Sequence, residues 1–370
     1  MARRSPLWLA TPSRFAGLKP RRAQFVLLGV VSLLLACFLA LVVHDPLPGS
    51  TNGNVAEGHT DVALYEAIID GVRYGGDYYT VAADALRAGG YPLRPFMTFR
   101  LPALAMVEAH LPRAVTIALL WALAVGVGFA WARRVAPALP RAAPRVVALL
   151  LLCDSMLAFV QPELLAFHEI WAAQFVALSL ALREPGRWIE SVALATIALL
   201  IRETAALYVL TMAGFAWIEG ERREAIGWAM ALAVFAAALA AHAAAVGGVT
   251  GPLDPVSAGW LGLQGFGLFV KSVTVSTGLT MFPQWFAALT VGLSLVGWAS
   301  WDSPVALRAL TIFGLYAIAI SLFARLDTFY WGLMVAPVLL VGLVFAPDGL
   351  RDLIAAALDR RRVRVQIVGR

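Results

Sequence analysis

Long apolar segments constrain this chain more than any other feature. A helix that crosses the ~30 Å hydrocarbon core of a bilayer needs about 20 mainly apolar residues. We expect such spans at 25–43, 114–132, 146–160, 163–182, 225–247, 280–300, 307–324 and 330–346. Only 14% of the residues are charged, against about 25% in soluble domains. The sequence therefore predicts an all-α polytopic membrane protein.

The stretch 187–217 is too long for one span, because a single helix of that length would measure about 46 Å at ~1.5 Å per residue. Arg202 and Glu203 lie at its midpoint. Basic residues concentrate in the cytoplasmic loops of membrane proteins, and they flank this stretch on both sides at Arg183, Arg187, Arg222 and Arg223. Since an even number of crossings must separate two inner loops, we expect a hairpin of two short helices with its apex at the outer side.

The same charge rule places both termini inside. The chain then forms one integral membrane domain, 1–370, with about ten crossings, a periplasmic first loop at 44–113 and a basic cytoplasmic tail at 347–370. Lysine occurs only at Lys19 and Lys271 amid abundant alanine and arginine, a bias typical of GC-rich bacterial genomes. We therefore expect a bacterial inner membrane protein whose positive charge reflects topology and not nucleic-acid binding.

The first loop is the largest polar part of the chain and contains eight of its 23 acidic residues. After Asp61, apolar side chains recur at helical spacing, which predicts an amphipathic helix. A second helix is expected at 80–88, ended by Gly89 and Gly90, and a third short helix after Pro102. These signals indicate a folded outer loop.

Several motifs of this loop recur together in one enzyme class. They are Asp61-x-x-x-Tyr65, Gly75-Gly76-Asp77-Tyr78-Tyr79, Arg94-Pro95 and Arg100-Leu101-Pro102, with Arg325-Leu326-Asp327-Thr328-Phe329-Tyr330-Trp331 late in the chain. Together with the topology, they resemble the GT-C glycosyltransferases, and within them the branch of bacterial mannosyl- and arabinosyltransferases. The likeness covers the topology of the whole chain but residue patterns in these two regions only. Many members carry paired acidic residues where Asp61 stands alone between Thr60 and Val62, which argues against the metal-dependent members.

The resemblance implies transfer of a hexosyl or pentosyl group from a polyprenyl-phosphate carrier to an envelope glycan or lipid acceptor at the periplasmic face. Asp61 would be the base of an inverting displacement, since such a reaction needs a group that takes the hydroxyl proton, and Asp77 is the reserve base. Arginines suit the departing phosphate. The expected substrate and phosphate contacts are Tyr65, Arg100, Arg202, Glu203, Arg325 and Asp327. We expect no cofactor or metal, because one His168-Glu169 pair is too small a ligand set.

Other interpretations stay open at this point. Asp61 could serve only as a helix N-cap, as could Thr60, and Arg202 with Glu203 could be a solvated apex. The chain could also be a polysaccharide or lipid transporter or flippase, although paired Gly/Pro-broken helices in corresponding halves are not evident. A third possibility is a non-catalytic subunit of an envelope-glycan assembly complex. The sugar and the acceptor are not determined by the sequence.

Overall fold

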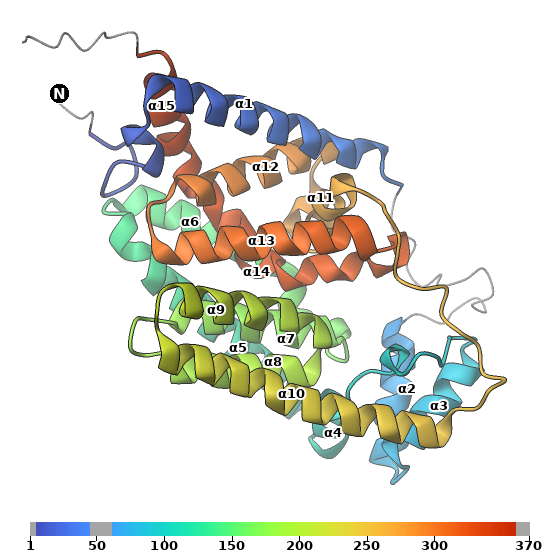
Figure 1. Ribbon diagram of the computed structural model, residues 1–370. Coiled ribbons are helices and arrows are strands. Elements are labelled where there is room, and N and C mark those ends of the chain that lie inside the picture. The colour runs from blue at the N-terminus through green and yellow to red at the C-terminus, as the bar shows by residue number, and fades with distance from the viewer. Residues whose placement is uncertain (1–4, 45–60, 360–370) are drawn as a thin grey trace, which may run out of the picture.

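The computed structural model describes residues 5–44 and 61–359, which fold as a bundle of helices (Figure 1). The main bundle consists of α1 (Pro20–Cys37), α5 (Arg113–Val135), α6 (Ala142–Ser155), α7 (His168–Leu182), α8 (Ile189–Ile201), α9 (Ala206–Ile218), α10 (Arg222–Val249), α11 (Phe266–Val275), α12 (Gln284–Ser300), α13 (Pro304–Phe323), α14 (Ala336–Leu339) and α15 (Ala346–Ala357). Three further helices lie in the described part of the first loop: α2 (Asp61–Arg73), α3 (Tyr78–Ala88) and α4 (Ala103–His110).

Among residues 5–44 and 61–359, four helices are long and apolar enough to cross a membrane: Pro20–Val42, Arg113–Ala138, Arg222–Val249 and Pro304–Phe323. A pair bent by 53°, Leu326–Met334 with Ala336–Ala357, would make a fifth. The all-helical prediction is confirmed for the described residues, and the length and composition of these helices suggest a membrane-embedded protein. The count of ten crossings stays a prediction, because the remaining apolar segments fold as shorter helices such as α7, α8, α9 and α11.

The stretch 187–217 forms two helices, as predicted. α8 ends before Arg202, a 3-10 turn covers Glu203–Ala205, and α9 follows. At the other end of the pair, Arg183 after α7 binds Glu224 on α10 at 2.8 Å and Glu219 after α9 at 3.3 Å. The segment before α8 and the end of α9 therefore lie close together. The two helices are antiparallel, with Arg202 and Glu203 at the turn between them.

The first part of the segment predicted as a cytoplasmic basic tail, 347–370, is helical. Residues 346–357 form α15, which packs against α1 and α12. Its fully buried Asp348 accepts hydrogen bonds from the backbone N–H groups of Leu7, Trp8 and Leu9 at 2.6–2.9 Å. The N-terminal segment is thereby fixed to α15. The tail arginines Arg360, Arg361, Arg362 and Arg364 lie outside the described residues.

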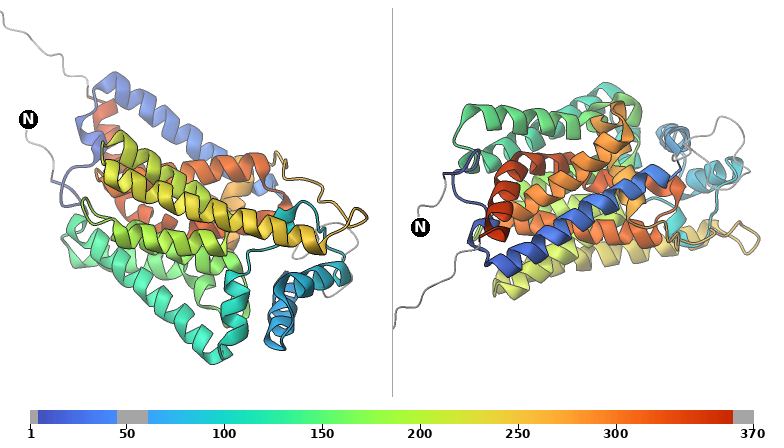
Figure 2. Two further views of the ribbon diagram at one scale, coloured as in Figure 1. Left: turned by 60° about the horizontal axis from the view of Figure 1, so that its bottom comes forward. Right: turned by 90° about the horizontal axis from the view of Figure 1, so that it is seen from above.

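The first-loop helices α2 and α3 lie at the end of the bundle opposite to α15 and the N-terminal segment (Figures 1 and 2). The helix expected at 80–88 begins earlier, at Tyr78. Asp77 is its N-cap, and its carboxylate accepts a hydrogen bond from the Thr80 N–H at 3.1 Å. Gly90 follows the helix with φ +69°, a conformation that glycine adopts without strain.

A segment between α10 and α11, residues 250–265, connects the bundle with the first loop. We call it the strap. The N–H of Leu93 donates to the carbonyl of Pro255 at 2.9 Å. Arg87 on α3 donates to both carboxylate oxygens of Asp254 at 3.0 and 2.9 Å, and these hydrogen bonds lower the pKa of Asp254 to about 2. The strap therefore holds the first-loop helices beside the bundle.

Candidate functional site

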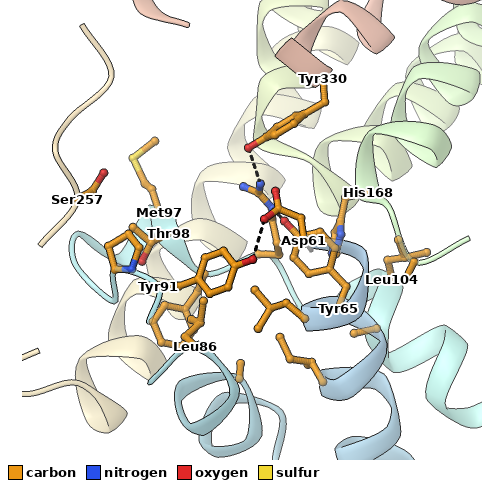
Figure 3. A pocket seen from close by; sticks show the side chains of 18 of the residues that line it. Asp61, Tyr65, Leu86, Tyr91, Met97, Thr98, Leu104, His168, Ser257 and Tyr330 are labelled. Atoms are coloured by element: carbon orange, nitrogen blue, oxygen red, sulfur yellow. Dashed lines mark hydrogen bonds between the residues drawn. The ribbon is translucent and has the colours of Figure 1, made fainter. Parts of the chain in front are cut away.

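A cavity of about 900 Å³, including its open mouth, lies where the first-loop helices meet the bundle (Figure 3). Its polar lining residues are Asp61, Tyr65, Tyr78, Tyr91, Thr98, Arg100, His168, Ser257, Arg325, Thr328 and Tyr330. Its apolar lining residues are Leu64, Ile68, Ile69, Ala82, Leu86, Pro92, Met97, Phe99, Leu104, Ala105, Ala166 and Trp260. The cavity is thus amphiphilic.

The spacing along α2 places both kinds of side chain in this cavity. Leu64 and Tyr65 follow Asp61 by three and four residues, and Ile68 follows these two by four and three, so the side chains share one face of the helix. All four line the cavity. The carboxylate is at the start of the helix and the apolar side chains follow it. The amphipathic face predicted from the sequence therefore lines the cavity and also packs α2 against the rest of the protein.

The half-buried Asp61 accepts a hydrogen bond from the hydroxyl of Tyr91 at 3.1 Å. In Figure 3, Tyr91 and Tyr330 approach the neighbourhood of Asp61 from opposite sides. Burial raises the pKa of Asp61 above its ordinary value, while the Arg100 guanidinium and the Tyr91 hydrogen bond oppose that rise. A carboxylate with a raised pKa is a stronger proton acceptor once ionised. Thr60, the alternative N-cap, lies outside the described residues.

Arg100 is the cation that two parts of the fold hold beside Asp61. It donates from Nε to the Tyr65 hydroxyl at 2.9 Å and from Nη2 to the Tyr330 hydroxyl at 3.3 Å. Its guanidinium carbon lies 5.7 and 6.0 Å from the centroids of these two rings, within the range of cation–π attraction. Tyr65 comes from α2 and Tyr330 from the far C-terminal part of the chain. Arg100 is therefore fixed from both sides.

A cluster of three charged residues, Arg202, Glu169 and Glu203, adjoins Arg100. Arg202, which is 2% exposed, donates to the fully buried Glu169 at 2.5 Å and also binds Glu203. Glu203 in turn lies 3.9 Å from Arg100. Two arginines thus face two glutamates, so the cluster and Arg100 together are electrically balanced. Buried charges are tolerated when they are paired in this way.

Arg325 also lines the cavity. It donates to Asp327 from Nε at 3.1 Å and from Nη2 at 2.6 Å, and to the strap carbonyl of Gly259 from Nη1 at 3.0 Å. Hydrogen bonding to Asp327 raises the pKa of Arg325 further. Asp327 therefore orients the guanidinium, and the strap contact adds a second constraint.

The structure separates the predicted site residues into two groups. Asp61, Tyr65, Arg100 and Arg325 line one cavity, whereas Arg202, Glu203, Asp327 and Asp77 are not among its lining residues. The guanidinium of Arg202 is directed to its two glutamates because it is buried at the helix turn. Asp77 is exposed and caps α3. The reserve base thus lies outside the cavity.

Sequence reasoning missed three polar lining residues that matter for the geometry: Tyr91, Tyr330 and His168. Tyr330 stood inside the quoted late motif, and Tyr91 directly follows the paired glycines. His168 is 3% exposed and its ring lies edge-on to Tyr65 at 5.1 Å. Only the fold reveals that these side chains meet, since they come from distant parts of the sequence.

Within the described ranges 5–44 and 61–359, no three His, Cys, Asp or Glu side chains are grouped so that they could hold a metal ion. In the comparisons with known proteins, no protein-family model, no curated protein and no solved structure matches this chain.

Proposed function

We propose that this chain is a GT-C type glycosyltransferase that uses a polyprenyl-phosphate sugar as its donor. The observation that supports this most strongly is the position of the Asp61 carboxylate. It lies in an amphiphilic cavity together with Arg100, which is fixed by Tyr65 and Tyr330. Base, cation and apolar wall are the elements that transfer from a lipid-linked phosphate requires.

In the proposed reaction the acceptor hydroxyl oxygen forms a bond to the anomeric carbon of the donor sugar. The bond between that carbon and the phosphate oxygen breaks, and its electron pair leaves with the polyprenyl phosphate. The hydroxyl proton moves to Asp61. Because attack and departure take place on opposite faces of the sugar, the anomeric configuration inverts.

The departing phosphate gains negative charge, which Arg100 and Arg325 would stabilise. Both guanidiniums line the cavity, and both are already oriented by hydrogen bonds. A preoriented donor costs little reorganisation when charge develops. Arg202 takes a supporting role in this proposal, since its cluster with Glu169 and Glu203 adjoins Arg100.

The apolar lining would receive the first isoprene units of the carrier. Withdrawing a lipid chain from the bilayer costs about 0.8 kcal/mol per exposed CH₂ group, so the rest of the tail must remain in the membrane. We place the cavity at the periplasmic face of a bacterial inner membrane, with about ten crossings and both termini in the cytoplasm. This orientation follows from the distribution of basic residues.

The test is turnover by the full-length protein in lipid nanodiscs, supplied with radiolabelled polyprenyl-phosphate hexoses and pentoses, with water as the hydroxyl group that receives the sugar. Release of polyprenyl phosphate should depend on the protein and fall by about 10²–10⁴-fold in Asp61→Asn. The matched control is Asp84→Asn, which changes an exposed carboxylate of α3. A loss of the same size in the control, or none in Asp61→Asn, would end the assignment of Asp61 as the base.

A further inference from the structure

A second pocket of about 490 Å³ lies between α2, α4 and the start of α5. This volume includes the open mouth of the pocket. Ile69 lines both this pocket and the first cavity, so the two are neighbours. The polar residues that line the second pocket are Glu66, Asp70, Arg73, Glu108, Arg113 and Thr116.

The two arginines of the second pocket already have acidic partners. Arg73 donates to Asp70 at 2.7 Å, and Arg113 donates to Glu66 at 3.2 Å. Arg73 also donates to the backbone carbonyl of Glu108 at 3.0 Å. Each positive charge is therefore compensated, and the third carboxyl of Glu108 adds acidic character. An anionic ligand such as a phosphate gains little from this arrangement.

Glu108 is the feature that points to a ligand. The residue is 5% exposed, and its side-chain Oε1 has no hydrogen-bond partner in the described structure. Leaving a buried polar atom unpaired is costly, and such atoms are rare in native proteins. Burial, the largest influence, raises the pKa of Glu108 to about 7, against the opposing effects of Arg113 and Arg73. The pocket thus presents an acceptor that lacks a donor.

We propose that the second pocket binds an uncharged sugar unit of the acceptor, with a sugar hydroxyl donating to Glu108. Neighbouring carboxylates and guanidiniums can accept from and donate to the remaining hydroxyls. This inference rests on the proposed transferase function, which it extends to the class of acceptor.

The position along α2 also defines which sugar unit binds there. Residues 66–73 lie about 8–18 Å from Asp61 along the helix axis at ~1.5 Å per residue. A unit held in the second pocket is therefore not the one whose hydroxyl reacts at Asp61. The acceptor is accordingly a glycan of more than one sugar. The second pocket binds one unit and thereby positions the reacting hydroxyl of another unit at Asp61.

The test measures binding without donor, so its result does not depend on turnover. Saturation-transfer NMR on the full-length protein in nanodiscs would compare neutral methyl glycosides and disaccharides of glucose, mannose, galactose and arabinose. At least one should bind, and Glu108→Leu should weaken that binding about tenfold or more. The matched control, Glu163→Leu, makes the same substitution at an exposed outer glutamate and should bind like the wild type.

If Glu108→Leu does not fold, Glu108→Ala takes its place in the binding measurement. This substitution removes the carboxylate without adding bulk. Glycoside binding and donor hydrolysis are measured separately, so a failure of this proposal is distinguished from a failure of the proposed function. The proposal is overturned if no glycoside binds the wild type, or if the Glu108 variants bind equally well. Tighter binding of inorganic phosphate or ethanolamine than of every glycoside would overturn it too.

Discussion

The buried carboxyl of Glu108 makes the stability of the protein depend on pH. This carboxyl lies on α4 among Arg73, Arg113, Glu66 and Asp70, and its pKa is raised from 4.5 to about 7. In the unfolded chain the same carboxyl titrates near 4.5. The folded protein therefore binds the proton more tightly than the unfolded protein does. Replacement by glutamine, which does not titrate, removes this difference.

The sign follows from linkage. Between pH 4.5 and 7 the folded state holds more protons at this site than the unfolded state, so the free energy of unfolding falls as pH rises. At about 1.4 kcal/mol per pH unit, the wild type loses about 3 kcal/mol relative to Glu108→Gln over this range. The stability from protonated Glu108 is fully present below pH 4.5 and absent above about pH 7.

The assay is thermal unfolding of both proteins in the same detergent across pH 4.5–8. The melting temperature of Glu108→Gln minus that of the wild type should grow by about 4 °C from the lowest pH to pH 7, and then stay constant. A difference that does not change with pH would refute the buried, unpaired state of this carboxyl. A difference that shrinks as pH rises would mean that the arginines, and not burial, control its titration.

Three further outcomes are expected. Arg100→Leu should lower donor turnover by about 10²–10³-fold, with partial recovery in Arg100→Lys because lysine lacks the planar fork; equal activity of all three proteins would exclude Arg100 from the site. Tyr91→Phe removes a hydrogen bond that lowers the pKa of Asp61, so the acid limb of the pH–rate profile should move to higher pH, and an unmoved or lowered limb would contradict this. A cysteine at Leu253 should react with an impermeant thiol reagent in whole cells, whereas one at Glu221 should not, and the reverse pattern would invert the topology.

The sequence predicted those features that local periodicity and charge determine. The spacing after Asp61 gave α2, and the end of α3 followed from Gly89 and Gly90. Charges on both sides of 187–217 gave the helix pair, because a membrane fold limits where basic residues can lie. These signals act over one helix or one loop.

The remaining features depend on contacts between distant segments, which one sequence does not specify. Arg100 meets Tyr330 across 230 residues, and Glu169 meets Arg202 because α7 and α8 pack together. For the same reason the sequence placed Arg202 among the phosphate contacts, although the structure pairs its guanidinium with Glu169 and Glu203. The ordered α15 was missed as well, since the partners of its Asp348 are backbone N–H groups at the other end of the chain.

The central claim is that the cavity at Asp61 holds the lipid-linked donor. Cryo-electron microscopy of Asp61→Asn in nanodiscs, saturated with a polyprenyl-phosphate sugar that the wild type turns over, tests it most directly. The account predicts the phosphate within hydrogen-bond distance of Arg100 and Arg325, the anomeric carbon facing residue 61, and the tail along the apolar wall formed by Leu64 and Ile68. Donor density outside this cavity, or a phosphate bound at the end of the bundle near α15, would contradict the account.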